Sequence, residues 1–265
     1  MSATLNYVDH LTRESARFAV AMRGASPDAP VPSCPDWSAD DLLWHLAEVQ
    51  WLWGTVVREG LTGSQAEELK PKRPEDGAGL AAFYETASRD LSQVLATTPP
   101  ETPAWTWSQD HSVGFIRRRQ AHEALIHRVD AELVADSRTP MDPHLSADGV
   151  DEVLRIMYGG VPPWGTTTPD SAKSLRLIAT DTGDSWLLSL GRFTGTDPDD
   201  DTTYDEPDID VADTDLGEET AATISARAAD LDCWLWHRPP VETVERSGDH
   251  GVLSEFESTI SPGID

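Results

Sequence analysis

Residues 38–56, SADDLLWHLAEVQWLWGTV, decide how the N-terminal part of the chain folds. Apolar residues recur there at helical spacing, as Leu42, Leu46, Val49, Trp53 and Val56. Ser38 lies three residues before Asp41, a pattern typical of the capping box at a helix N-terminus. The stretch therefore predicts a long α-helix with one inward face. His45 falls on that face, because it lies three residues after Leu42.

Three further helical patterns surround this one. They cover about residues 5–24, 80–99 and 114–135. Four helices of this length, joined by connections rather than strands, are typical of a bundle whose facing side chains can build metal and cofactor sites. A fifth helix is expected at residues 148–158 with Ser146 as its cap, so the first domain is expected to span residues 1–160.

The sequence changes character after a linker predicted at residues 161–171, and residues 170–265 predict a small α+β domain. Residues 174–180 and 185–190 have strand composition and flank the turn sequence DTGD, so they predict a hairpin. Residues 197–219 are rich in Asp, Thr and Pro, which predicts a solvated acidic loop. The remaining expected elements are strands at 220–226 and 241–248 and helices at 228–238 and 251–258.

Composition restricts the possible partners. The chain has 265 residues, with 20 Lys and Arg against 47 Asp and Glu, and a formal net charge of -27. Such a surface repels nucleic acid and anionic lipid, so neither is expected as a partner. Cys34 and Cys233 form no CxxC pattern, and the sequence shows neither a signal peptide nor an apolar run of membrane length. We therefore expect a cytoplasmic protein, either a monomer or a small homo-oligomer.

Three side chains of the predicted bundle form a candidate metal site. Glu123 and His127 are spaced i, i+4, which places both on one face of a helix, and His45 lies on the inward face of another helix. Two imidazoles and one carboxylate are a set that catalytic zinc sites use when a fourth position stays open. Zinc is the first expectation for this divalent metal, although nickel, iron or copper would suit the same ligands.

The same residues also have simpler interpretations. A lone inward histidine such as His45 is commonly a hydrogen-bonded core residue. The helix that carries Glu123 could instead present a solvated row of charge pairs, formed by Arg119, Glu123, His127 and Asp130. His122 lies about 100° around that helix from Glu123, so it is expected to pack or to support the site rather than to bind the metal. Spacing alone leaves these alternatives open.

Longer motifs carry a resemblance to a known family. They are PSCPDWSADDLLWHLAEVQ at 32–50, RRRQAHEALIHRVDAEL at 117–133, AADLDCWLWHRPP at 228–240 and SGDHGVL at 247–253. Their order and separation resemble the mycothiol-dependent maleylpyruvate isomerase-like enzymes, within the DinB-like metal-binding helical bundle superfamily. The resemblance implies a DinB-like four-helix bundle followed by a sterol-carrier-like domain. It also implies that His45, Glu123 and His127 hold the metal and that Arg238 is a catalytic residue reaching toward the active site.

The same resemblance implies a metal-dependent enzyme acting on a small electrophilic substrate, with mycothiol as a cosubstrate that becomes a thiolate on the metal. Addition to a conjugated cis double bond, rotation and elimination would make it an isomerase, and displacement of a leaving group would make it an S-transferase. Arg238 would pair with a substrate carboxylate or enolate, or would only bind carbonyls at a helix C-terminus. Two alternatives stay open: a hydrolase that uses metal-bound water with Asp130 as base, and a non-enzymatic ligand-binding protein with a structural metal.

Overall fold

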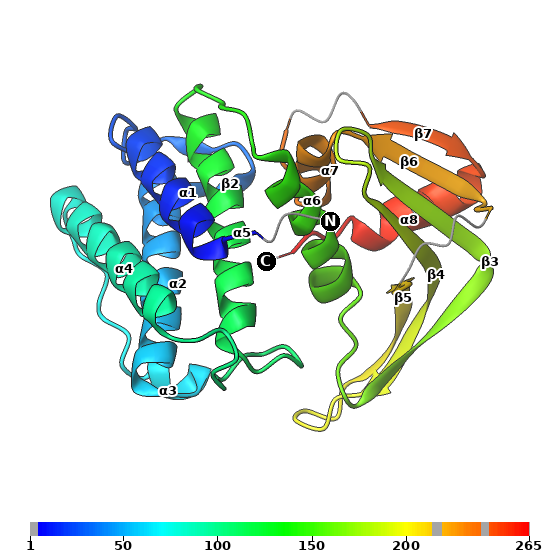
Figure 1. Cartoon of the computed structure of the whole chain (residues 1–265), viewed down its shortest axis with the longest axis horizontal. Helices are drawn as coiled ribbons and strands as arrows, with labels where there is room; N and C mark the ends of the chain where they lie inside the picture. The colour runs from blue at the N-terminus through cyan, green and yellow to red at the C-terminus, as the bar shows by residue number, and fades with distance from the viewer. Residues whose placement is uncertain (1–4, 214–218, 240–243, 265) are drawn as a thin grey trace. The chain divides into compact units, whose positions relative to one another are not determined.

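The computed structural model describes residues 5–213, 219–239 and 244–264. The chain divides into two compact units, Met1–Pro140 (unit 1) and Met141–Asp265 (unit 2). Unit 1 is largely helical, and unit 2 combines a sheet with helices (Figure 1). The α+β class predicted from the sequence is therefore confirmed.

Four long helices and one short helix make up most of unit 1 in the described residues. The long helices are α1 (Tyr7–Met22), α2 (Ala39–Glu59), α4 (Gly77–Thr97) and α5 (Val113–Val134). The short helix α3 (Gly63–Glu67) lies in the connection after α2. Helix α2 packs against α4, and α1 packs against α5 (Figure 1). The apolar faces meet in a core that includes Phe18, Leu42, Leu46, Leu80 and Tyr84.

Helix α2 begins where its sequence predicts, directly after Ser38. The Ser38 side chain accepts the backbone N–H of Asp41, and the Asp41 carboxylate accepts the backbone N–H of Ser38, which completes the capping box. Hydrogen bonds from Ser38 and Arg73 lower the pKa of Asp41 to about 2, so the cap stays charged near neutral pH. The helix ends at Gly60, whose φ of 67° is a left-handed conformation that glycine adopts without steric cost.

A two-stranded hairpin precedes α2, where the sequence indicates only a Pro-rich connection. Strand β1 (Pro30–Val31) pairs antiparallel with β2 (Cys34–Ser38). Strands this short leave no alternating pattern in the sequence, and prolines ordinarily argue against a strand. The hairpin places Trp37 and Ser33 beside the helices of unit 1, and both matter for the candidate site.

Unit 2 contains a five-stranded sheet in the order β5-β4-β3-β6-β7. Its strands are β3 (Gly165–Ala179), β4 (Ser185–Thr196), β5 (Thr203–Val211), β6 (Ala222–Ala226) and β7 (Glu245–Gly248). Strands β3 and β6 run parallel, and the other neighbouring pairs are antiparallel. Helix α7 (Ala228–Leu235) follows β6, and α8 (His250–Ile260) packs against the sheet. The predicted β3–β4 hairpin, the strand before α7 and both later helices are therefore confirmed.

The fifth predicted helix, expected in the first domain, corresponds to two helical elements that belong to unit 2. Helix α6 (Pro143–Glu152) continues directly into a π-helix, η1 (Val153–Tyr158), and α6 packs against α7. The fifth predicted helix also begins earlier than expected. Its N-cap is Asp142 rather than Ser146, because the Asp142 carboxylate accepts two backbone N–H groups of the first turn.

The predicted acidic loop at residues 197–219 contains a strand, which corrects the sequence interpretation. Strand β5 pairs with β4 along its whole length, although Ile209 is its only fully buried residue. The composition of the segment indicates that it buries too little apolar surface to adopt an ordered structure by itself. Its order comes instead from backbone hydrogen bonds to the edge of an existing sheet. Residues 214–218 of the predicted loop lie outside the described residues.

Two boundaries in unit 2 also differ from the prediction. Strand β3 begins at Gly165, inside the segment 161–171 that was predicted to be a linker, because its first residues pair with the far end of β4. Strand β7 covers the second half of the strand predicted at 241–248, and residues 240–243 lie outside the described residues.

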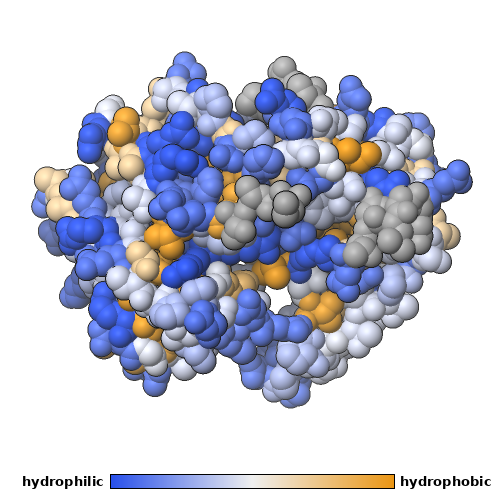
Figure 2. Space-filling model, viewed as in Figure 1, coloured by the Kyte–Doolittle hydropathy of each residue, from blue (hydrophilic) through white to orange (hydrophobic). Residues whose placement is uncertain are grey.

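Hydrophobic side chains are scattered on the surface. Val20, Leu69 and Trp107 are the exposed large hydrophobic residues of the described chain. The face in Figure 2 shows hydrophobic residues in small separate groups within a mostly hydrophilic surface. Among the described helices, none combines the length and the apolar character that a membrane crossing requires.

Candidate metal centre

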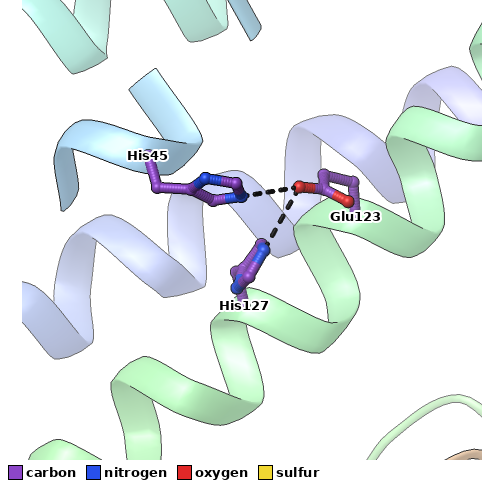
Figure 3. Close-up of side chains that lie close together, drawn as sticks. All are labelled: His45, Glu123 and His127. Carbon is purple, nitrogen blue, oxygen red and sulfur yellow. Dashed lines mark hydrogen bonds and ion pairs between the residues drawn. The ribbon is translucent and has the colours of Figure 1, made fainter. Parts of the chain in front are cut away.

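The three predicted ligands lie together in unit 1. His45 comes from α2, while Glu123 and His127 come from successive turns of α5 (Figure 3). The Nε2 atoms of both histidines lie 3.2 Å from Oε1 of Glu123. One ligand atom from each residue lies within 4.8 Å of the others. The two helices therefore bring together the atoms that a metal-binding set would require.

Helix geometry explains this arrangement. The i, i+4 spacing places Glu123 and His127 one above the other on α5, which packs against α2. The side chains of His45, Glu123 and His127 are 29%, 16% and 9% exposed. The cluster is thus mostly buried, and its greatest exposure is at His45. Partial exposure of this kind suits a site that a small molecule must enter.

Asp130 holds His127 from the other side of its ring. The Asp130 carboxylate is fully buried, and its Oδ2 lies 2.9 Å from Nδ1 of His127. Ser33, from the turn between β1 and β2, donates its hydroxyl to Oδ1 of Asp130 at 2.5 Å. A carboxylate at Nδ1 keeps a proton on that nitrogen, so that Nε2 can offer its lone pair to a metal once the proton it shares with Glu123 is lost. Metal-binding histidines commonly have such a partner.

Arg119 and Trp37 complete the surroundings of the cluster. Arg119 is 4% exposed and donates from Nη2 to Oε2 of Glu123 at 2.9 Å. The Trp37 ring packs on both imidazoles, with ring centroids 4.7 Å from His45 and 6.2 Å from His127. Neither Ser33 nor Trp37 is predicted from the sequence to take part in the site. Their only signal was their place in the PSCPDW motif directly before α2.

Charges around the cluster determine its protonation. Burial alone would raise the pKa of Glu123, but His127, a hydrogen bond from His45 and the charge of Arg119 outweigh it and hold the pKa well below its usual value. Burial would likewise lower the pKa of His127, but Glu123 and Asp130 raise it to about 9. Near neutral pH and without a metal, Glu123 is therefore charged and His127 is protonated. A metal ion that binds here must displace that proton.

The alternative of a solvated row of charge pairs on α5 is correct about the pairs and wrong about the solvation. Arg119 contacts Glu123, Glu123 contacts His127, and His127 contacts Asp130. Arg119 and Asp130 are buried, at 4% and 0% exposure. Because buried charges need close compensation, this row acts as a support for the cluster rather than as a surface feature. The donor set and its outer partners fit a divalent metal held by two imidazoles and one carboxylate.

His122 does not join the cluster. It is 1% exposed, and its ring meets the Tyr7 ring edge-on at a centroid distance of 6.3 Å. The ligand group found among the described residues contains His45, Glu123 and His127 without it. The packing role expected for His122 from its angle around the helix therefore agrees with its contacts.

Arg238 lies in unit 2, just after α7. Its side chain is largely buried, donates from Nη1 to the Trp236 carbonyl at 2.6 Å, and lies 5.9 Å from the centre of the Trp236 ring. The carbonyl contact matches the simpler interpretation of Arg238 as a cation at a helix C-terminus. The catalytic role predicted for Arg238 stays a prediction.

Comparison with known proteins agrees with the family motifs. The model of the mycothiol maleylpyruvate isomerase N-terminal domain matches residues 8–132, and that of the MDMPI C-terminal domain matches residues 144–255. No curated protein sequence matches the chain.

Solved structures of similar fold agree with this result. The chain is similar to the crystal structure of a mycothiol-dependent maleylpyruvate isomerase, at 11% identity, 92% coverage of each chain and a TM-score of 0.57. It is also similar to a histidine-to-alanine mutant of such an isomerase, at 9% identity, 92% coverage of each chain and a TM-score of 0.59. At these identities, the likeness shows the fold. Because the two family models together span most of the sequence, the chain belongs to the mycothiol-dependent maleylpyruvate isomerase-like family of enzymes.

Proposed function

We propose that this protein is a metal-dependent isomerase that uses a low-molecular-weight thiol, mycothiol, to isomerise a small electrophilic substrate. One observation carries the proposal: two imidazole Nε2 atoms and one carboxylate oxygen converge between α2 and α5. Family membership favours isomerisation over S-transfer. Zinc is the first candidate for the metal, since it is commonly bound by this ligand set.

Some residues of the site would bind the metal, and others hold the metal-binding side chains in position. His45 and His127 would bind the metal through Nε2, and Glu123 would bind it through Oε1. A divalent cation held there would lower the pKa of a coordinating thiol and so supply a thiolate near neutral pH. Asp130 keeps His127 in the required tautomer. The Trp37 ring packs against the two imidazoles and helps to fix their positions.

The sulfur nucleophile would come from outside the protein. The ligand group found in the described residues contains no cysteine. The two cysteines of the chain are not joined in a disulfide: Cys34 lies in β2, and Cys233 is buried in α7. In the proposed reaction the thiolate would add to one carbon of a cis double bond conjugated to a carbonyl, and the electron pair of the double bond would move to the carbonyl oxygen as an enolate. The resulting single bond would rotate, and collapse of the enolate would restore the double bond and expel the thiolate. The thiol is therefore not consumed.

Arg238 is proposed to pair with a carboxylate of the substrate or with the developing enolate. Support comes from its place in the CWLWHR motif of the family and from its guanidinium, which suits planar oxyanions. Replacement by Lys should raise KM more than it lowers kcat if Arg238 mainly binds substrate. Replacement by Met should lower both kcat and kcat/KM if it stabilises the enolate. Unchanged kcat and KM in both variants would contradict a role in the reaction and would leave Arg238 with only its structural contact at the helix C-terminus.

Hydrolysis by metal-bound water has less support. It needs a general base near the metal, and Asp130 was the candidate. Both carboxylate oxygens of Asp130 are engaged, one with His127 and one with Ser33, and the side chain is fully buried. Asp130 is therefore suited to orient His127 rather than to accept protons from water.

The proposal is tested by isomerase activity and metal content measured on one preparation. The wild-type protein should contain about one divalent metal per chain and should convert maleylpyruvate to its trans isomer only when mycothiol is added. Glu123→Gln removes the ligand charge while keeping its size, and it should lose both metal and activity. Thiol-independent turnover, or full activity after complete metal removal, would refute the proposal.

A further inference from the structure

Arg119 contacts the candidate metal centre through the carboxylate oxygen that the imidazoles do not contact. Both histidines approach Oε1 of Glu123, as Figure 3 shows, while Nη2 of Arg119 donates to Oε2 at 2.9 Å. The side chains of Arg119 and Glu123 are 5% and 16% exposed, so this bond lies largely out of water. The two residues are spaced i, i+4 on α5, so one helix fixes their relative position.

A carboxylate can bind a metal with one oxygen or with two, and the choice changes the number of positions left for other ligands. With one oxygen from Glu123, the protein supplies three donor atoms, the number typical of catalytic sites with an open position. With two oxygens it supplies four, the number typical of closed structural sites. The partner of Oε2 therefore affects whether a thiol can bind.

We propose that Arg119 is a positioning residue that restricts Glu123 to one metal-binding oxygen and so keeps a coordination position available for the thiol. This inference rests on the proposed metal-dependent function. The charge-assisted hydrogen bond occupies Oε2, and a second interaction of this oxygen with the metal would require breaking that bond. Without Arg119, Oε2 would be a mostly buried carboxylate oxygen without its charged donor, and turning toward the metal would compensate it.

The test uses Arg119→Met in the full-length protein loaded with cobalt(II), whose visible absorption weakens as coordination number rises. Before any thiol is added, the variant should absorb more weakly than the wild type. Its cobalt affinity should be equal or higher, because the metal gains a donor atom. Titration with 2-mercaptoethanol, which probes the open position without requiring recognition of mycothiol, should give an apparent Kd about tenfold or more above that of the wild type.

Arg89→Met is the matched control. Arg89 lies on α4, its side chain is 65% exposed, and it pairs with its neighbour Asp90. The control removes the same charge from a helix without touching the site, and it should match the wild type in all three measurements. If Arg119→Met does not fold, Arg119→Leu takes its place, because it also removes every donor to Oε2 and is judged by the same measurements.

Two results would overturn the role of Arg119. One is an unchanged cobalt spectrum with unchanged thiol affinity. The other is a loss of cobalt affinity parallel to the loss of thiol affinity, which would indicate general damage to the site. Failure of the proposed function is distinguishable, because the cobalt spectrum before thiol addition reports on Glu123 even if neither 2-mercaptoethanol nor mycothiol binds.

Discussion

Helix α5 carries two buried ionic clusters on adjacent residues, and they differ in kind. The first surrounds Arg128, which is fully buried and donates to Glu14 at 2.9 Å, to Glu132 at 2.8 Å and to the Thr139 carbonyl at 3.1 Å. We call these residues the Arg128 cluster. The second is the candidate metal centre, whose ligand His127 directly precedes Arg128. The Arg128 cluster matches a permanent cation to carboxylates and links α1 to α5.

The metal centre has different chemistry in a similar setting. Its histidines can each present a neutral nitrogen lone pair, whereas a guanidinium has donors only. Its side chains are partly exposed, up to 29% at His45, while Arg128 and Glu14 have no exposure. Buried ion pairs on one helix can thus either stabilise the fold or form part of a metal-binding site. The two clusters differ in whether their nitrogen atoms can offer a lone pair to a metal and in whether their side chains are exposed to solvent. Substitutions in each cluster test this difference.

The largest expected effect is on the Arg128 cluster. Arg128→Met removes the fully buried cation that Glu14 and Glu132 share, although Arg13 and Arg17 still contact the other oxygen of Glu14. Loss of one partner from a buried pair typically costs about 3–5 kcal/mol. Urea unfolding of the metal-free protein should show this loss. The folded fraction should bind metal with nearly wild-type affinity. A loss below about 1 kcal/mol would contradict the structural role assigned to this cluster.

His127→Ala should have the opposite pattern. It removes a metal ligand, so metal affinity should fall at least about 100-fold, since loss of even an outer partner costs roughly 10–100-fold. The stability of the metal-free protein should change less than in Arg128→Met. Competition with a chromophoric chelator measures the affinity. His122→Gln, on the same helix, is the control and should stay within about threefold of wild type; equal losses in both variants would reject His127 as a ligand.

Asp130→Asn tests the support of the site. The amide cannot supply the negative charge that holds His127 by its Nδ1, so metal affinity should fall about 10–100-fold. The same chelator competition applies. Ser33→Ala, one step further from the metal, should show a smaller loss of the same sign. Wild-type affinity in Asp130→Asn would show that the contact between Asp130 and His127 does not serve metal binding.

The mildest perturbation is a change of pH, and metal affinity should depend on it. The pKa of His127 is raised to about 9, so the metal-free protein holds a proton there below that pH. Affinity should therefore rise with pH, by at most about tenfold per unit, and level off near pH 9. The same proton stabilises the metal-free fold below the usual value of 6.5 and is lost as pH approaches 9. A flat affinity between pH 6 and 9 would contradict this protonation state.

Much of unit 1 can be predicted from the sequence because the patterns that determine its helices lie within short stretches of the chain. The capping residues and spacing of α2 lie within one stretch, and the i, i+4 spacing on α5 places Glu123 beside His127. The pairing of His45 with Glu123 spans 78 positions and has no local signal. The family motifs supplied that expectation.

The supporting contacts of the site could not be predicted in the same way. Ser33 reaches Asp130 across 97 positions, through a hairpin whose strands are too short to leave a pattern. Strand β5 is ordered by pairing with β4, which its acidic composition does not reveal. Asp142 outcompetes Ser146 as a helix cap because Pro143 after it suits the first helical position. In each case a distant partner or a competing local signal determines the structure.

The most direct test of the proposed function is a titration of the cobalt-loaded wild-type protein with mycothiol, followed by absorption spectroscopy. Sulfur ligation of cobalt(II) gives a charge-transfer band that water or hydroxide ligation does not give. The proposed function predicts a band that saturates at about one mycothiol per chain and that is missing in His127→Ala. A protein that binds cobalt at this site but develops no such band at saturating mycothiol would contradict it.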